Sequence, residues 1–309
     1  MSASQESATA AESLPSATDP VPDKRPGLAG RRPSLLKVLS LPWLGEVCLG
    51  VLLLIVLFCF LGPVFYHTNT FAANILAENQ PPTAQHLLGM SPEGRDEIGQ
   101  LMAGGQNTLL VGLGAGIVAT LFGLIYGAVA GYVGGFLDAL LMRTVDALSA
   151  IPVLFFAVLL GAMVRPTLWF IILIIAAVSW TSTARVVRGE VLRLRTLAYV
   201  EASHVFGGRG GYVIRRHLIP NVLGVVVVNG TLKVADSILL FASISFLGLG
   251  LPPPATDWGA MLTEGVNNLF DGYWWQLWPV AILIVVTVLA VVTIGDEMEA
   301  RYLAGSDRG

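Results

Sequence analysis

Two ionisable side chains, Lys233 and Asp236, lie three residues apart within an apolar stretch that covers residues 222–247. On a helix this spacing places both side chains on one face, where they can neutralise each other. Charged groups are costly in hydrocarbon, so they usually face a protein interior or a water-filled path. Two interpretations stay open. The pair contacts a solute that crosses the membrane, or it only keeps a charged helix foldable in lipid.

A polar, arginine-rich segment separates two apolar stretches in the second half of the chain. Residues 185–216 contain seven arginines, and such residues are concentrated in cytoplasmic loops. Thr196 can cap a helix over 197–206, Gly207 is the residue type that often ends one, and a second short helix is predicted over 212–218. This arrangement suits a partner's groove. The alternative is an ordinary basic loop near lipid head groups.

Patterns for covalent chemistry are missing from the sequence. The phosphate-binding pattern G-x-x-x-x-G-K-[ST] does not occur, so we expect the chain to bind no nucleotide itself. The four histidines lack cysteine or carboxylate neighbours at metal-ligand spacing. There is also no catalytic triad, no paired-carboxylate arrangement and no basic-aromatic surface for nucleic acid. We therefore expect no catalytic residue, no metal site and no cofactor in this chain.

The composition is that of a membrane protein. Of 309 residues, 54% are hydrophobic and 13% are charged, with a mean hydropathy of +0.71; soluble domains carry about 25% charged residues. Six apolar stretches are each long enough to cross about 30 Å of hydrocarbon. The predicted fold is an all-α membrane protein with six transmembrane helices, at residues 44–65, 108–132, 147–164, 167–184, 222–247 and 277–294.

The placement of charge orients these spans. Basic residues precede the first span, and the long loops after the first and fifth spans are net acidic, which predicts that both termini are cytoplasmic. Trp274, Trp275 and Trp278 lie where the last outer loop meets the sixth span, as expected of an interfacial aromatic belt.

Four regions are predicted: a disordered cytoplasmic tail at 1–42, the first helix and outer loop at 43–107, a five-helix core at 108–296, and a cytoplasmic tail at 297–309.

The second span carries a stripe of small residues. They are spaced four apart, so they share one face of a helix. Small side chains let a second helix approach closely, which is how membrane helices pack. We expect the stripe to pack against a helix of this subunit or of a partner. Its members are Ala115, Ala119, Gly123, Gly127, Gly131 and Gly135.

Four sequence blocks resemble the permease subunits of ABC importers for dipeptides, oligopeptides and nickel, and most closely the second of the two permeases. They cover residues 88–296 in the family's order. The third is the family's EAA loop, here within 190–221, where Ser203 replaces a usual alanine. The blocks are Leu88-Gly89 with Gly94-Arg95-Asp96; Gly134-Gly135 with Asp138, Met142-Arg143 and Asp146; Glu201-Ala202, Gly207 and Pro220-Asn221; and residues 246–250 with Pro252-Pro253, Trp258-Gly259 and Met261-Leu262.

The resemblance implies the type I importer permease architecture and a division of labour between subunits. In that family the EAA loop forms a coupling helix that docks on a separate ATPase subunit. The implied partners are a second homologous permease, one or two ATPase subunits that bind ATP and magnesium, an extracytoplasmic binding protein, and the lipid bilayer of a bacterial inner membrane. The residues implied in docking are Glu201, Ala202, Ser203, Gly207, Pro220 and Asn221.

The implied function is uptake of short peptides into the cytoplasm. Arg95 and Asp96 are candidate gate residues, which can pair with each other or with other residues of the gate region, and Lys233 and Asp236 are candidates for the translocation path. Within the family the alternative is a nickel-complex or glutathione importer. Outside it, the alternatives are a scaffold or sensor subunit and an ATPase-independent channel or carrier. Such a carrier usually shows an internal repeat with broken helices, and the sequence shows no convincing one.

Overall fold

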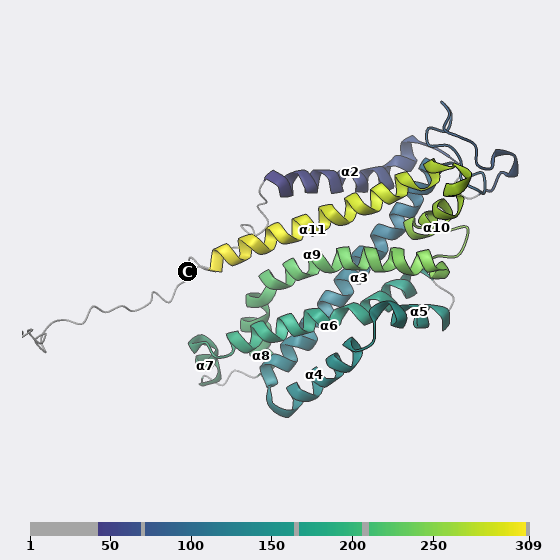
Figure 1. Cartoon of the computed structure of the whole chain (residues 1–309). Helices are drawn as coiled ribbons and strands as arrows, with labels where there is room; N and C mark the ends of the chain where they lie inside the picture. Colours follow the sequence, from purple (N-terminus) through teal and green to yellow (C-terminus); the bar gives the residue numbers. More distant parts are fainter. Residues whose placement is uncertain (1–42, 69–71, 164–166, 206–209, 307–309) are drawn as a thin grey trace, which may run out of the picture.

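The protein is a bundle of long helices (Figure 1). A computed structural model describes residues 43–68, 72–163, 167–205 and 210–306, so the predicted N-terminal tail at 1–42 lies outside it. The described residues form no β-strand, only an isolated bridge between Met90 and Asp96, and the all-α prediction is confirmed. The main helices are α2 (Trp43–Phe65), α3 (Glu97–Val133), α4 (Gly135–Ser149), α5 (Val153–Met163), α6 (Leu168–Leu194), α9 (Ile219–Ile244), α10 (Trp258–Asn268) and α11 (Trp278–Ser306).

Among the described residues, five helical segments are long and apolar enough to cross a membrane, and the bent pair of α4 and α5 passes the same test when the two helices are taken together. The bend between α4 and α5 is 80°. If this pair counts as one span, the prediction of six is confirmed, but the straight third span over 147–164 is wrong. Pro152 explains the break, because proline has no N–H to donate and disfavours helical geometry at the residue before it.

Helix α3 begins at Glu97, well before the predicted start of the second span at residue 108. Asp96 starts the helix, because its Oδ1 accepts a hydrogen bond from the Gly99 N–H at 2.9 Å. Two polar side chains in the extra turns find partners on distant backbone. Gln106 donates to the Cys59 carbonyl and Asn107 to the Thr256 carbonyl, each at 2.7 Å. At the other end of the chain, α11 continues to Ser306, into the expected tail.

The small-residue stripe of α3 packs against α6 of the same subunit. A Cβ atom built on Gly123, Gly127 or Gly131 would lie against the backbone carbonyls of Trp180, Ala184 and Arg188, and Ala115 and Ala119 are fully buried. The stripe prediction is confirmed through Gly131. Gly135 lies beyond the contact, because the chain turns out of α3 at Gly134, whose φ is +68°.

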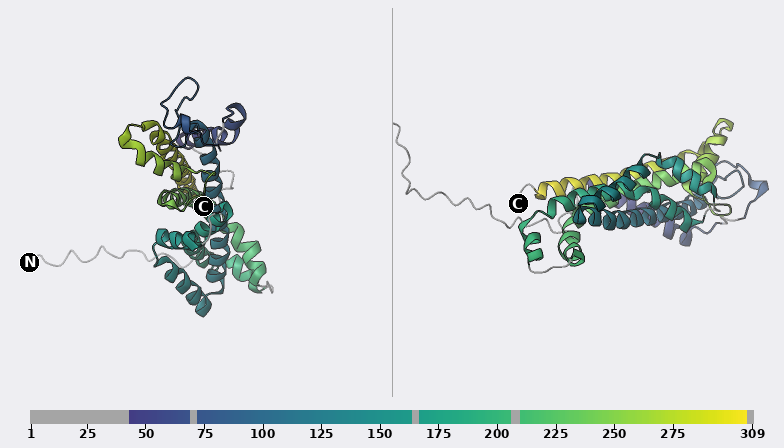
Figure 2. Two further views of the ribbon diagram at one scale, coloured as in Figure 1. Left: turned by 90° about the vertical axis from the view of Figure 1, so that its right-hand side faces the viewer. Right: turned by 90° about the horizontal axis from the view of Figure 1, so that it is seen from below.

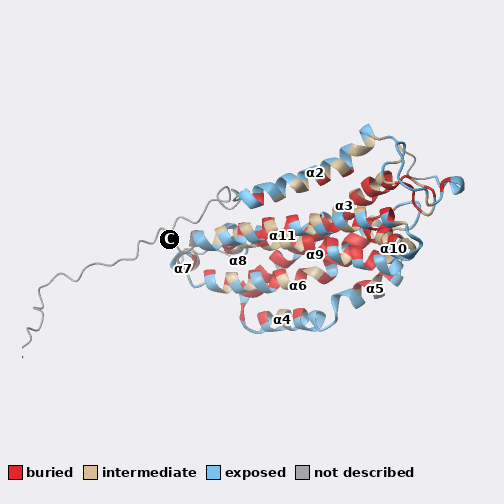
Figure 3. Ribbon diagram, turned by 45° about the horizontal axis from the view of Figure 1, so that its top comes forward, coloured by how far each residue is buried: buried red, intermediate tan, exposed pale blue. Residues whose placement is uncertain are grey.

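Burial is concentrated in the centre of the bundle (Figure 3). Helices α3, α6 and α9 contain most of the fully buried residues, whereas α2 is largely exposed and packs along α11. Two short helices project from one end of the bundle, near the C-terminus, and the segment 72–96 lies at the opposite end (Figure 2). The candidate site residues therefore lie at two ends and along one helix between them.

Candidate functional site

Between α6 and α9 the chain forms a loop with two short helices, which we call the α6–α9 loop (residues 195–218). Helix α7 (Ala198–Val205) follows α6, and α8 (Gly210–Val213) continues through the π-helical turn Ile214–Leu218 into α9. The two predicted helices are therefore confirmed within the described residues, while Gly207 lies outside them. Thr196 donates its hydroxyl to the Arg193 carbonyl at 3.0 Å and so completes the end of α6.

The predicted docking residues that the structure describes lie in α7 and in the first turn of α9, directly after the loop. Glu201, Ala202 and Ser203 belong to α7, while Pro220 and Asn221 begin α9. Asn221 connects the two helices. Its Nδ2 donates to the Tyr199 hydroxyl in α7 at 3.2 Å and to the His217 carbonyl at 2.5 Å.

An apolar core fixes the base of the α6–α9 loop to the bundle. Val200 of α7 and Val213 of α8 are fully buried, as are the neighbouring residues Leu218 and Val222. They pack in one cluster with residues of α3 and α6, namely Leu124, Ala128, Val187, Val191 and Leu194. Close packing of this kind transmits displacement rather than absorbing it. A force on α7 would therefore reach α3, α6 and α9.

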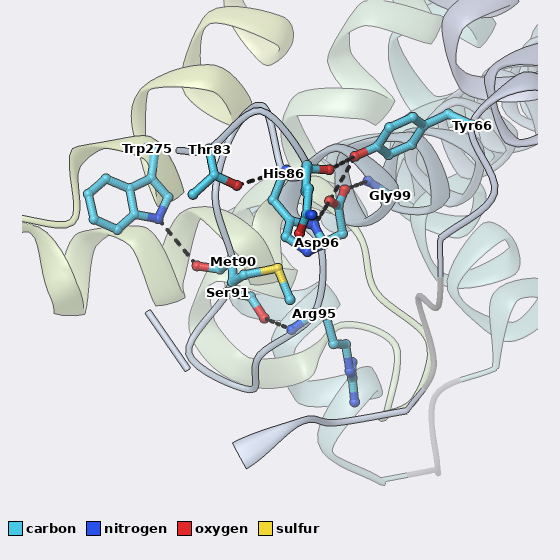
Figure 4. Close-up of polar contacts among 10 residues, drawn as sticks. Tyr66, Thr83, His86, Met90, Ser91, Arg95, Asp96, Gly99 and Trp275 are labelled. Atoms are coloured by element: carbon cyan, nitrogen blue, oxygen red, sulfur yellow. Dashed lines mark hydrogen bonds and ion pairs between the residues drawn. The ribbon is translucent and has the colours of Figure 1, made fainter. Parts of the chain in front are cut away.

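At the opposite end of the bundle, Arg95 and Asp96 do not pair with each other. The Arg95 guanidinium contacts Glu93 at 2.7 Å. The Asp96 carboxylate is buried, and its Oδ2 accepts the Tyr66 hydroxyl at 2.9 Å and lies 2.8 Å from His86 Nδ1 (Figure 4). Loss of solvent, and then the hydrogen bond to Asp96, raise the pKa of Tyr66 to about 12, so Tyr66 stays a neutral donor at physiological pH.

Asp96 thus joins three parts of the chain: the residue that follows α2, the segment 72–96, and the first turn of α3. A polar cavity of about 800 Å³ opens beside it, lined among others by Tyr66, His67, Asn74, Gln80 and His86. The arrangement can hold the segment 72–96 against the helix ends. The described residues around the cavity offer hydrogen-bonding groups.

Lys233 and Asp236 form the pair that their spacing predicts. The Lys233 ammonium lies 2.6 Å from the Asp236 carboxylate, and the two side chains are 14% and 59% exposed in this single chain. Neighbouring positions of α9 face other helices, since Val234 packs on Gly116 of α3 and Leu232 on Gly295 of α11. Both alternatives therefore remain, because the pair neutralises itself and also leaves a charged oxygen accessible.

Residues 120–301 match the family described as binding-protein-dependent transport system inner membrane component. The chain is also 34% identical to the dipeptide transport system permease protein DppC of Bacillus subtilis strain 168 over 251 residues, which cover 81% of this chain and 78% of the relative. The chain belongs to this family. It is 38% identical to the oligopeptide transport system permease protein OppC of Escherichia coli K12 (80% and 82% covered) and 33% identical to OppC of Bacillus subtilis (82% and 83%).

The family match covers the α6–α9 loop and the Lys233–Asp236 pair, whereas Arg95 and Asp96 precede the matched residues. The resemblance inferred from the four sequence blocks is confirmed. The roles of the individual residues stay predictions.

Sequence reasoning missed two groups that organise the end of the bundle near Asp96. Asp257 is buried and caps α10, accepting the Ala260 N–H at 3.0 Å; burial raises its pKa. Trp275, expected in an interfacial belt, is also buried and donates to the Met90 carbonyl at 3.2 Å. The adjacent Trp274 and Trp278 are exposed, as a belt requires. Trp275 differs from these two tryptophans because its hydrogen-bond acceptor, Met90, lies far away in the sequence. Local sequence therefore could not single it out.

Proposed function

We propose that this chain is the membrane-spanning permease subunit of an ATP-driven importer that moves short peptides into the cytoplasm. The observation that carries the proposal is the α6–α9 loop, whose two short helices project from the bundle while their base is buried among α3, α6 and α9. The relatives named for dipeptide and oligopeptide transport support the substrate class.

The proposed partners divide the work. A separate ATPase subunit, or two, binds ATP and magnesium and receives α7 in its groove, with Glu201, Ala202, Ser203, Gly207, Pro220 and Asn221 forming the docking surface. A second homologous permease completes the path across the inner membrane, and an extracytoplasmic binding protein delivers the peptide to the end of the bundle near Asp96. Both termini are cytoplasmic, and this chain carries out no chemistry on ATP, peptide or nucleic acid.

The mechanism requires a rigid connection and two states of the bundle. ATP binding would move α7, and the buried contacts of Val200, Val213 and Leu218 would pass that movement to the long helices. The ATPase can shift the equilibrium between inward- and outward-open states only as far as it binds one state better. Lys233 and Asp236 would contact the passing peptide from α9.

The test is purification of the intact complex from native membranes, followed by reconstitution into liposomes. Recovery of a second permease, a P-loop ATPase and a binding protein, together with ATP-dependent uptake of a labelled di- or tripeptide, would support the proposal. A chain that purifies alone, and that passes peptide without ATP, would replace it with a carrier or channel. Uptake of a nickel complex or glutathione but not of peptides would change the substrate and keep the mechanism.

A further inference from the structure

Helix α4 is joined to α6 by a forked ion pair. The Arg188 side chain donates from Nε to Asp138 Oδ1 at 2.5 Å and from Nη2 to Asp138 Oδ2 at 2.7 Å. Two parallel hydrogen bonds between a guanidinium and a carboxylate fix distance and orientation together. Asp138 is buried, with 8% of its surface exposed. The Arg188 side chain is 33% exposed, so water reaches only the guanidinium side of the pair, and the two parallel bonds hold α4 against α6.

Further contacts join the same ends of α3, α4 and α6. Arg195, which follows the last residue of α6, donates from Nη1 to the Gly131 carbonyl in α3 at 3.1 Å. Tyr126 of α3 donates its hydroxyl to the Leu141 carbonyl of α4 at 3.0 Å. Because α7 begins at Ala198, shortly after Arg195, the helix that holds α4 leads directly into the α6–α9 loop. A displacement of the loop therefore acts first on α6 beside its contact with α4.

The other end of α4 leads to the bend before α5. The two helices meet at 80° around Pro152, and α5 packs with α6 and α9 through the fully buried Ala157. Gly161 of α5 also lies near Leu249, the last residue of the π-helical segment Ser245–Leu249 that follows α9. A movement of α4 would therefore reach α5 through the bend, at the far end of the bundle from α7.

We propose that Asp138 and Arg188 are positioning residues, which make α4 follow the movement of the α6–α9 loop and so deliver that movement through the bend to α5. The inference rests on the proposed function. It adds a second route to the direct displacement of α6 and α9, and it assigns a role in coupling to residues that contact neither ATP nor peptide.

A nearby pair provides a matched control. Arg185 of α6 contacts Asp146 of α4 through a single hydrogen bond of 3.1 Å, and both side chains are exposed, at 47% and 60%. Exposed pairs of this kind contribute little, since water competes for both charges. The control connects the same two helices with the same two residue types, but without burial or a fork.

The first test measures movement in the wild-type arrangement. Spin labels at Leu140 of α4 and Val186 of α6, both exposed, are introduced after Cys48→Ser and Cys59→Ala, and the distance between them is measured in the complete importer without nucleotide and with ATP trapped. The proposal expects the same distance distribution in both states. A change above about 2 Å, the scale on which helices shift at moving interfaces, would overturn it, because α4 would then not follow α6.

The second test measures peptide transported per ATP hydrolysed, in complexes of equal subunit composition. Asp138→Asn and Arg188→Gln should each lower this ratio by about tenfold, within the range typical of coupling between sites. Asp146→Asn should leave it within about twofold, because an exposed pair contributes little. The exchange Asp138→Arg with Arg188→Asp should recover part of the loss. A purely structural pair would lower the yield of complex and leave the ratio unchanged.

An unchanged ratio in the assembled single variants would refute the role of the pair while leaving the importer intact. If the variants fail to assemble, the spin-label distances in the otherwise native complex decide. Failure of the wild-type complex to hydrolyse ATP or take up peptide would refute the proposed function instead. The two failures are therefore distinguishable.

Discussion

At the scale of single residues, a buried carboxylate connects several elements at each end of the bundle. Asp96 caps α3 and accepts from Tyr66 and His86, and Asp138 holds Arg188. The sequence singled out Asp96 as a gate candidate but not its partners, because Tyr66 and His86 are 30 and 10 residues away. Local spacing could predict the Lys233–Asp236 pair for the opposite reason, since one helix fixes both members.

Substitutions of Asp96 can separate its role as the cap of α3 from its contacts with Tyr66 and His86. Asp96→Ala removes the helix cap and both other hydrogen bonds, and we expect it to destabilise the protein by about 1–3 kcal/mol. Asp96→Asn keeps an oxygen that can cap α3, so it should cost less. Thermal unfolding of the purified complex in nanodiscs checks the order, with Tyr66→Phe as the variant that loses one hydrogen bond. Equal unfolding temperatures for Asp96→Ala and wild type would contradict the assignment.

The Lys233–Asp236 pair can be tested by comparing single and double changes. Each single change to leucine leaves one charge without its partner and should reduce assembly more than the double change does. If the pair contacts the passing peptide, the double variant should assemble normally but lose uptake by about tenfold, the scale of a lost charged contact. Uptake at the wild-type rate in that variant would leave only the role in folding.

At the scale of helices, packing faces are more predictable than breaks or ends. The stripe from Ala115 to Gly131 could be predicted because its period matches one helix face. The early start of α3 could not, since the carbonyls that pair the polar side chains of Gln106 and Asn107 belong to Cys59 and Thr256, which are distant in sequence. The bend at Pro152 was readable in principle, but hydropathy alone favours an uninterrupted span.

Gly127 provides a test of the contact between α3 and α6. A Cβ at this position would lie against the Ala184 carbonyl and Val187, so Gly127→Ala must separate the two helices or strain them. We expect a loss of about 1–3 kcal/mol, the usual cost of overpacking. Gly50→Ala in α2 is the control, because a Cβ there meets no described atom within 4 Å. If both variants unfold at the same temperature, the close approach carries no energetic weight.

At the scale of the whole molecule, one helix joins the two functional ends. Helix α3 has 37 residues and a length of about 55 Å at 1.5 Å per residue, so it extends beyond about 30 Å of hydrocarbon. Asp96 lies at its start, and the contacts of Tyr126 and Gly131 with α4 and α6 lie near its end. The order of the four sequence blocks could predict this architecture, but only the structure relates the α4–α6 contact to the α6–α9 loop.

The whole assembly is tested most directly at α7. Glu201→Arg reverses a charge on the helix that we expect to dock on the ATPase. The new arginine would face the ATPase groups that suit a glutamate, and like-charge contacts suppress association across an interface. The variant should reach the membrane at the normal level but lose bound ATPase and lower uptake by more than about tenfold. Glu299→Arg, at an exposed position near the end of α11, is the control and should retain both. Normal uptake by Glu201→Arg would mean that α7 does not receive the movement of the ATPase, and the carrier or channel mechanism would then account better for the fold.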